Sequence, residues 1–499
     1  MNDWAELSDA LDGITASGTA EIREDGEWLA ELAAPRCELR LEGKSPLVHL
    51  WSDKRNLTRR VLRVRERSQD RVVLEVQRFG RARPSRLEVV RAQSPRPAKR
   101  VAREQFCAGF TRILADCFPD ATIEPLTASP DLENSFSGVY ARGYMYEGSR
   151  AWAMMAVAPG ESTAAMEGIL AFGVLWLDWL RGRAQVRAIE GLRLFLPEGA
   201  GNCVRERCAA LSSNTGVEIF EFRVEDGRIF KMDCADTGNL ISLLVPRGEA
   251  ESTRSAARDA IRRIHALALH IPPAGSEIGL RLVPGTAEVS LGFRGLKFGS
   301  WSSKDGISFG LGDSHEKLTS SNELALDELM RTLDLWRSPL AKDTRHSLYR
   351  AAPERWLEAL VLDDPTRLDA QLDPRHLYSQ VPALTAGDRG VLDLLGVTRR
   401  GRLVVIELKA SEDIQLPIQA VDYWLRVCRH QRDDDFHRHG YFAGIELDPK
   451  PPLIWIAAPA LRFHSATDVI LKYVSPEIRI TRIGLNENWR RSLKVVFRQ

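Results

Sequence analysis

Apolar and charged residues alternate in short runs over residues 37 to 93. The clearest of these runs are 37–42, 61–67 and 72–78. Alternation with a period of two puts apolar and charged side chains on opposite faces of β-strands. The pattern predicts a small antiparallel sheet or barrel in a domain of residues 1–100, which a Pro-containing linker at 93–99 closes.

Beyond Val101 the pattern changes to an alternation of helices and strands. Apolar residues first recur at helical spacing, at Phe106, Phe110, Ile113 and Leu114. The elements predicted after this helix are a hairpin (139–145 and 151–158), a helix (166–180) and two strands (192–196 and 217–222). Their order predicts an α/β domain over residues 101–249.

The remaining chain divides into two parts. Residues 250–345 predict an amphipathic helix, a β-rich insert of Gly-punctuated strands between 277 and 311, and a linker helix at 323–336. Residues 346–499 form a second α/β domain. The predicted fold class is therefore a multidomain α/β protein with a small antiparallel β domain, two α/β units and a β-rich insert.

Composition limits the class of protein. The chain has 499 residues, of which 44% are apolar and 27% charged, as in ordinary globular proteins. Its longest strongly apolar helical stretch, 168–177, is too short to cross a bilayer. The N-terminus lacks the pattern of a secretory signal, and seven scattered cysteines have no metal-binding spacing. We expect a cytoplasmic protein with no membrane segment and with reduced thiols.

Charge is distributed unevenly along the chain. The net charge is +1, but Trp51 to Arg103 holds 17 Lys/Arg against 5 Asp/Glu, a local charge of +12. Within the run 61–67, strand alternation puts Arg63, Arg65 and Arg67 on one face, opposite Leu62, Val64 and Glu66. Such a stripe could bind nucleic-acid phosphates. The alternative is an ordinary solvated strand face.

The most informative segment is 390–410. Two apolar strands flank a Thr-Arg-Arg-Gly turn, and the second strand, Leu403–Ile406, is apolar throughout and therefore predicted to be buried. Glu407 and Lys409 follow it and share a face, and Asp393 on the first strand can reach the same place. Charges at the end of a buried sheet are costly unless they pair or bind an ion, so this cluster predicts a site.

These residue types suit metal-dependent phosphodiester hydrolysis. Asp393 and Glu407 are candidate ligands of Mg²⁺ or Mn²⁺, and Lys409 could orient the attacking water. A helix beginning at Pro353 carries Glu354 and Glu358 on one face, either of which could supply a third metal-binding acid.

Further residues on the same segment could support this chemistry. Gln419 and Tyr423 form a second helical pair that could support the site, and Tyr423 could equally be a core residue. Arg399 and Arg400, in the turn, are candidates for contacts with nucleic acid.

This arrangement resembles the PD-(D/E)xK nuclease superfamily. Asp393 corresponds to the acid of the first half-motif, although Leu392 precedes it in place of proline, and Glu407-Leu-Lys409 corresponds to the second. Gln419 and Tyr423 look like the Gln-x-x-x-Tyr motif of the RecB-like branch, and the order of acids also looks like that of the NucS/EndoMS nucleases. The resemblance covers roughly residues 350–430. It implies a restriction-endonuclease-like fold and a catalytic set of Glu358, Asp393, Glu407, Lys409, Gln419 and Tyr423.

The 101–249 domain resembles a degenerate copy of the last domain. A gapless shift of 252 residues places Asp393 on Ala141, Glu407 on Met155 and Lys409 on Val157. In this register every charged position of the site becomes apolar. Two unrelated hairpin-plus-helix units could also be aligned in this way. A degenerate copy would be free to bind DNA, to hold a protein partner or a second copy of the chain, or to pack against the last domain.

The sequence thus predicts a Mg²⁺-dependent (or Mn²⁺-dependent) DNA endonuclease, in repair, restriction or phage defence. One alternative is a nucleic-acid-binding scaffold with an inactive nuclease fold. The other is an interaction protein in which the hairpin end is only a salt bridge. The sequence does not distinguish DNA from RNA as the substrate.

Overall fold

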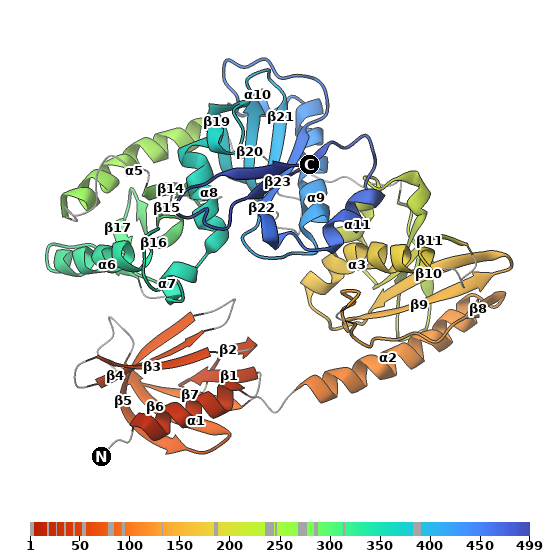
Figure 1. The fold of residues 1–499 in the computed structure, drawn as a ribbon, viewed down its shortest axis with the longest axis horizontal. Helices are drawn as coiled ribbons and strands as arrows, with labels where there is room; N and C mark the ends of the chain where they lie inside the picture. The colour runs from red at the N-terminus through yellow and green to blue at the C-terminus, as the bar shows by residue number, and fades with distance from the viewer. Residues whose placement is uncertain are drawn as a thin grey trace. The chain divides into compact units, whose positions relative to one another are not determined.

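The structure, a computed structural model, shows a mixed α/β protein, and its described residues form four β-sheets (Figure 1). It describes residues 4–16, 19–25, 27–33, 36–42, 45–51, 56–77, 84–91, 95–131, 133–183, 188–234, 244, 247–267, 277–283, 288–312, 315–382 and 391–499. The chain forms two compact units. The smaller unit holds residues 1–101 with 309–317 and 343–351, and the larger unit holds the rest.

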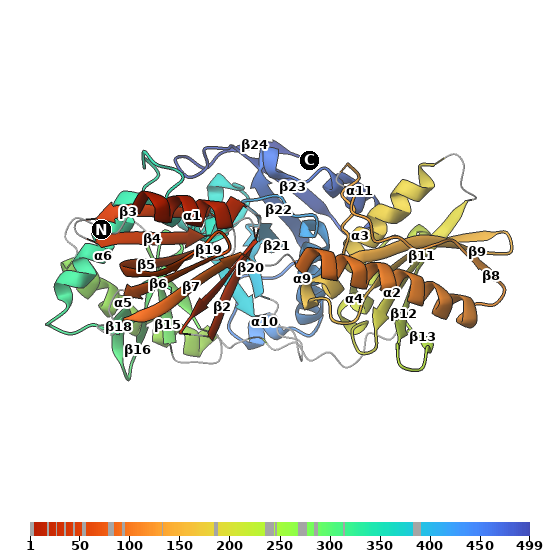
Figure 2. The same ribbon diagram turned by 90° about the horizontal axis from the view of Figure 1, so that it is seen from below.

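In the smaller unit, the described residues between 4 and 91 form a helix, α1 (Trp4–Ala16), and a seven-stranded antiparallel sheet (Figure 2). In the order of the sheet, the strands are β2 (Glu27–Ala33), β1 (Thr19–Glu24), β7 (Ser85–Arg91), β6 (Arg71–Gln77), β5 (Asn56–Arg67), β4 (Ser45–Trp51) and β3 (Arg36–Glu42). Leu7, Leu11 and Ile14 of α1 are fully buried against apolar side chains of the sheet. The predicted β domain therefore also contains a helix.

The predicted arginine stripe on β5 is wrong, because the strand carries two β-bulges. The register against β6 shifts between Val61 and Arg63 and again between Val64 and Glu66. Each bulge adds a residue and changes which face the next side chain takes. Val61, Val64 and Arg67 consequently pair with Val76, Leu74 and Val72, whereas Arg63 pairs with Glu75. Arg63 and Arg67 therefore do not share a face.

The first α/β module, residues 95–231, begins with α2 (Pro95–Cys117). Pro95 to Lys99 thus belong to a helix and not to the predicted linker. The remaining elements are β8 (Ala121–Ile123), β9 (Tyr140–Glu147), β10 (Arg150–Val157), α3 (Thr163–Arg181), β11 (Ile189–Pro197), α4 (Asn202–Cys208), η1 (Ser213–Thr215), β12 (Val217–Phe222) and β13 (Ile229–Lys231).

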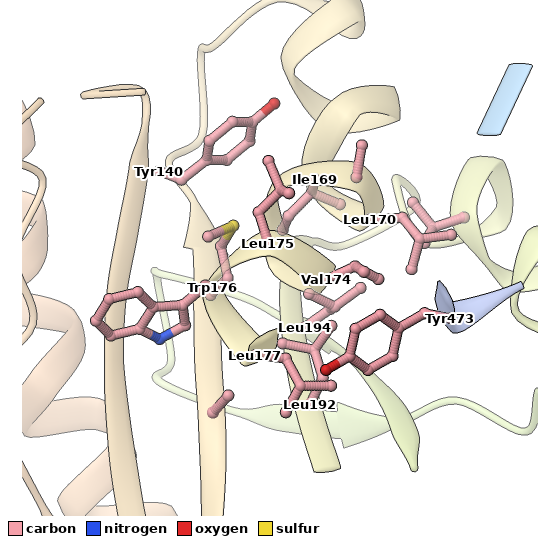
Figure 3. Packing of buried hydrophobic residues seen from close by; sticks show 14 of the residues in the cluster. Tyr140, Ile169, Leu170, Val174, Leu175, Trp176, Leu177, Leu192, Leu194 and Tyr473 are labelled. Atoms are coloured by element: carbon pink, nitrogen blue, oxygen red, sulfur yellow. The ribbon is translucent and has the colours of Figure 1, made fainter. Parts of the chain in front are cut away.

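In this module the sheet lies between two helices. Phe110 and Leu114 of α2 pack on one face with Phe195, Phe220 and Phe222 of the sheet. On the other face the side chains of α3 pack against those of β9, β10 and β11, and Tyr473 joins this core from elsewhere in the chain (Figure 3). By length and composition, α3 is the one described helix apolar enough to cross a membrane. Its apolar residues are those of a core helix.

A β-rich segment separates the two α/β modules. Its elements are α5 (Arg247–Leu267), β14 (Ile278–Leu282), β15 (Glu288–Phe293), β16 (Leu296–Ser302), β17 (Gly306–Phe309), β18 (Glu316–Lys317), α6 (Glu323–Trp336) and α7 (Ser347–Arg350). The five strands form one sheet in chain order. The predicted strands between 277 and 311 and the predicted helix at 323–336 are both confirmed.

The second α/β module, residues 353–498, contains a six-stranded mixed sheet. Its elements are α8 (Pro353–Asp363), η2 (Pro365–Arg367), β19 (Leu372–Pro382), β20 (Val391–Thr398), β21 (Leu403–Leu408), α9 (Leu416–Arg432), α10 (Asp435–Arg438), β22 (Leu453–Pro459), η3 (Ala460–Arg462), α11 (Ala466–Tyr473), β23 (Ile480–Leu485) and β24 (Val495–Arg498). Helix α9 lies across β21 and β22 (Figure 1).

The two α/β modules have the same topology. Their sheets run β8-β9-β10-β11-β12-β13 and β19-β20-β21-β22-β23-β24. In each sheet the first two pairings and the last are antiparallel, and the third and fourth are parallel. A helix precedes each sheet, a long helix links strands three and four, and a short helix links strands four and five. This agreement supports duplication of one α/β unit.

The register of the two hairpins corrects the gapless alignment. Glu407 pairs with Ile456, which is three residues before the end of β22 at Pro459. Met155 pairs with Leu194, which is likewise three residues before the end of β11 at Pro197. Glu407 therefore corresponds to Met155, as the shift of 252 predicts. Continuing the ladder of β20 and β21 one step beyond Leu394↔Ile406 puts Asp393 opposite Glu407, whereas Met155 is opposite Arg142.

Asp393 thus corresponds to Arg142 and not to Ala141. The reason is the turn: three residues, 399–401, follow Thr398, but only Gly148 and Ser149 separate β9 from β10. One of the three site positions is therefore charged in the first module. Arg142 is buried, lies over the rings of Phe136 and Trp176, and donates to the Ser129 carbonyl.

The two modules pack against each other through helices. Asp422 of α9 forms ion pairs with Arg426 of the same helix (2.9 Å) and with Arg207 of α4 (3.4 Å). All three side chains are buried. A buried carboxylate between two buried guanidinium groups leaves them uncompensated if it is removed.

We expect Asp422→Ala to lower the free energy of unfolding by about 3–5 kcal/mol, because it leaves two buried cations without this partner. Thermal unfolding followed by circular dichroism should show a Tm lower by roughly 6–20 °C. The matched control is Asp433→Ala at the exposed end of the same helix, which should change stability by no more than about 0.5 kcal/mol. Equal Tm values for the two variants would contradict the packing described.

Candidate active site

Strand parity places Asp393 and Glu407 on the face of the sheet that α9 covers. Leu395 and Val405 pack in one core cluster with Val427 of α9. Asp393 is two residues from Leu395, and Glu407 is two residues from Val405, so each shares its neighbour's face. The two carboxylates are thus opposite each other on adjacent strands.

Asp393, Glu407 and Lys409 form a connected cluster. The Leu408 amide donates to Asp393 Oδ2 at 3.1 Å. Lys409 Nζ lies 3.4 Å from Glu407 Oε1 and 3.4 Å from Asp413 Oδ2. Glu407 is only 3% exposed, and its second oxygen, Oε2, is buried without a hydrogen-bond partner. One carboxylate oxygen therefore remains available to a cation.

Burial shifts the pKa values of both acids upward. It raises the pKa of Glu407 well above its ordinary value, and the neighbouring Asp393 carboxylate adds to the shift. Burial also raises the pKa of Asp393, against the opposing effects of the Leu408 amide and of Lys409. For Lys409, burial lowers the pKa but Glu407, Asp413 and Asp393 more than offset it, so the ammonium stays protonated. A cation bound between Asp393 and Glu407 would therefore interact favourably with both carboxylates.

Helix α8 brings two further acids close to Asp393. Glu354 Oε1 accepts from the Ala410 amide at 3.3 Å and from the Ser411 hydroxyl at 3.5 Å. Glu358 is 3% exposed and accepts from Arg355 Nη1 at 2.7 Å. Burial raises the pKa of Glu358, in spite of Arg355 and a second arginine, Arg281.

The predicted three-acid metal set is not assembled. Within the part of the chain that the structure describes, no group of three or more His, Cys, Asp or Glu side chains could hold a metal ion. Glu358 is directed to arginines and does not join Asp393 and Glu407. Two carboxylates nevertheless fit Mg²⁺, which keeps several waters and takes only one or two protein carboxylates. The unpartnered Oε2 of Glu407 is consistent with that fit.

Tyr423 and Gln419 lie on the side of α9 that faces the acids. Burial raises the pKa of Tyr423, and Glu407 and Asp393 add to the shift, which places the phenol beside the acid pair. Gln419 is one turn earlier, and its Oε1 is buried without a hydrogen-bond partner. Both residues accordingly belong to the surroundings of the cluster.

The turn arginines do not reach the cluster. Arg399 and Arg400 are exposed at the far end of the hairpin. Arg399 is six residues from Asp393 along the strand, or about 20 Å. They could contact only a distant part of a long ligand.

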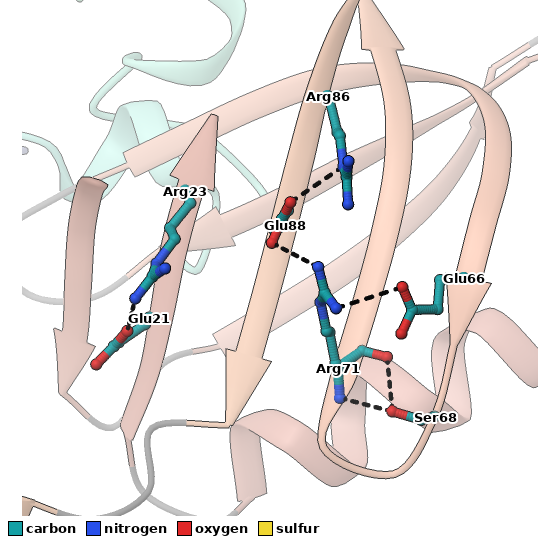
Figure 4. A network of polar contacts seen from close by, with 7 residues as sticks. All are labelled: Glu21, Arg23, Glu66, Ser68, Arg71, Arg86 and Glu88. Carbon is teal, nitrogen blue, oxygen red and sulfur yellow. Dashed lines mark hydrogen bonds and ion pairs between the residues drawn. The ribbon is translucent and has the colours of Figure 1, made fainter. Parts of the chain in front are cut away.

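Ion pairs neutralise much of the N-terminal basic block. Arg65 pairs with Glu75 and Arg67 with Glu6, and Arg71 and Arg86 both reach Glu88 (Figure 4). Residues 1–101 together hold 20 Lys/Arg against 16 Asp/Glu, a net charge of only +4. Of the three predicted arginines, Arg63 is the one for which the structure shows no ion pair, and it is exposed.

Three charged residues at the site were not predicted from sequence. Arg355 and Arg281 contact Glu358, and Asp413 contacts Lys409. Two of them could have been found from their position in the sequence: Asp413 is four residues after Lys409, and Arg355 directly follows Glu354. Arg281 comes from β14, more than 70 residues before Glu358, and has no such signal.

No family model matches the chain, and no curated protein matches it. The assignment of a function therefore depends on the residues of the site and their geometry.

Glu407→Gln should stabilise the metal-free protein at pH 7, by about 1–3 kcal/mol, because it removes a carboxyl whose ionisation the buried position disfavours. A carboxyl whose pKa is raised by folding lowers stability at every pH where the unfolded chain is ionised at that position, because the folded protein must then either keep the proton or bury the charge. The cost is absent below the unfolded pKa of about 4.3 and grows as pH rises toward the folded value. Denaturant unfolding from pH 4 to pH 8 should show the gain increasing with pH.

The matched control for this experiment is Glu412→Gln, an exposed glutamate five residues away. It should show no such dependence. A Glu407→Gln variant that is less stable than the wild type at every pH would contradict the electrostatic description.

Proposed function

We propose that the chain is a metal-dependent nuclease that hydrolyses phosphodiester bonds, with DNA as its substrate and its active centre in the second α/β module. The observation that carries the proposal is the pair formed by the half-buried Asp393 and the buried Glu407, opposite each other on adjacent strands and accompanied by Lys409. Two like charges in a desolvated position are costly, and a divalent cation between them would remove that cost.

In this proposal Asp393 and Glu407 hold Mg²⁺ or Mn²⁺. When bound, the cation supplies Lewis-acid activation of water and neutralises charge on the phosphate. Lys409 is held by Glu407 and Asp413, and its protonated amine orients the attacking water or donates to a phosphate oxygen. The water oxygen would bond to phosphorus and give up a proton to solvent, the bond to the leaving oxygen would break, and that oxygen would take up a proton from solvent.

The surroundings of the pair support the same chemistry. Tyr423 and Gln419 offer polar groups on the α9 side, and burial of the cluster strengthens each electrostatic interaction. In the first module Arg142, Met155 and Val157 take the places of the acids and the lysine, so that module would not bind a divalent cation. Of the two α/β modules, the second would therefore carry the centre and the first would pack against it.

Purified wild-type protein with Mg²⁺ or Mn²⁺ should cleave at least one of linear, circular and single-stranded DNA. Asp393→Asn and Glu407→Gln should each reduce the rate at least about 10²-fold, because each removes a charge that holds the cation. Binding of DNA, measured by fluorescence anisotropy in Ca²⁺, should stay near the wild-type value because no basic residue is lost.

Glu412→Gln is the control and should cleave like the wild type. RNA in a parallel reaction tests the other nucleic acid. Cleavage by Glu407→Gln at the wild-type rate would refute the assignment of the site. DNA binding without any metal-dependent cleavage would favour a scaffold with an inactive nuclease fold.

The N-terminal sheet, in this proposal, contributes weakly to DNA binding through Arg63. Arg63→Ala should flatten the dependence of log K on log salt by about 0.9, the value for one lost duplex phosphate contact. Arg65→Ala should change the slope less, because Arg65 is paired with Glu75. Equal slopes for the wild type and both variants would leave the N-terminal sheet without a role in binding.

A further inference from the structure

Glu358 joins two arginines that come from different parts of the chain. Arg355 lies one turn earlier on α8, with Nη1 2.7 Å from Glu358 Oε2. Arg281 lies on β14 of the β-rich segment, with Nη2 3.7 Å from the same oxygen. The carboxylate is therefore shared between two guanidinium groups.

Burial differs between the carboxylate and the arginines. The Glu358 side chain is 4% exposed, whereas those of Arg281 and Arg355 are 35% and 32% exposed. The buried carboxylate holds one side of each guanidinium group in place. The other side of each group stays accessible to solvent. The three side chains carry a net charge of +1.

These arginines are within electrostatic reach of the acid pair. Asp393 interacts with Arg281 and with Arg355, and it also interacts with Glu358. A site built from Asp393, Glu407, Glu354 and Asp413 would repel a polyanion. The two arginines supply positive charge where a phosphate must approach these carboxylates.

We propose that Glu358 is a positioning residue and not a metal ligand: it holds Arg281 and Arg355 so that their guanidinium groups bind a phosphate of the strand at the Asp393–Glu407 centre. This inference rests on the proposed nuclease function. Guanidinium groups match phosphate oxygens in a bidentate geometry, which a lysine cannot reproduce. The β-rich segment then contributes a residue to the centre through Arg281.

The first experiment measures single-turnover cleavage by Arg281→Ala and Arg281→Lys. We expect Arg281→Ala to be slower by about 10²-fold, as after the loss of one preorganised donor to a developing charge. Arg281→Lys should recover only part of the rate. Added guanidinium ion, below denaturing concentrations, should accelerate Arg281→Ala and not the wild type, which loss of structure alone would not produce.

The control is Arg331→Ala, an exposed arginine of the same β-rich segment that is paired with Asp327. It should cleave at the wild-type rate. DNA affinity in Ca²⁺ should change less than about 10-fold for Arg281→Ala, because one phosphate contact among several is lost.

The second experiment measures Mn²⁺ binding by isothermal titration calorimetry, which does not depend on activity. Glu358→Gln should bind Mn²⁺ with the wild-type affinity and cleave slowly. Asp393→Asn should lose Mn²⁺ affinity. Loss of Mn²⁺ affinity in Glu358→Gln, equal to that in Asp393→Asn, would show Glu358 to be a ligand and overturn this inference.

The outcomes separate this inference from the proposed function. If the wild type cleaves and Arg281→Ala cleaves equally fast, the phosphate-binding role is wrong while the nuclease assignment stands. If the wild type cleaves no nucleic acid with Mg²⁺ or Mn²⁺, the nuclease assignment is wrong and the inference is overturned with it.

Discussion

The central constraint in this protein is the close approach of two carboxylates on adjacent strands, the buried Glu407 and the half-buried Asp393. Asp393 and Glu407 are opposite each other beneath α9, and one oxygen of Glu407 has no hydrogen-bond partner. A fold keeps such a pair only if something compensates the repulsion and the lost hydration. Lys409 and the Leu408 amide compensate part of it. The part of the repulsion and of the lost hydration that they leave uncompensated is the reason for proposing a divalent cation between the two carboxylates.

The two α/β modules show what happens to the same sheet without this constraint. They share strand order, strand directions and the positions of their helices. The first module has Met155 where the second has Glu407, and Arg142 where the second has Asp393. Arg142 is itself positively charged, and it contacts the rings of Phe136 and Trp176 and the Ser129 carbonyl. The fold therefore forms without an acid pair at these positions. The pair in the second module is not needed for folding, which is consistent with a functional role.

Much of the site could be predicted from sequence, because its determinants are local. The apolar strand before Glu407, the two-residue spacing to Lys409 and the short hairpin placed Asp393 and Glu407 on one face. Predictions that assumed regular geometry were wrong. The bulges of β5 changed the faces of its arginines, and a turn longer by one residue moved Asp393 from Ala141 onto Arg142. Arg281 could not be predicted, since its contact with Glu358 depends on how β14 packs in three dimensions.

The most direct test of the central claim is an anomalous difference map from crystals of the full chain soaked in Mn²⁺. We expect a peak between the carboxylates of Asp393 and Glu407, and none beside Arg142 and Met155 of the first module. Crystals without a peak at the acid pair, although Mn²⁺ is bound elsewhere on the chain, would contradict the account.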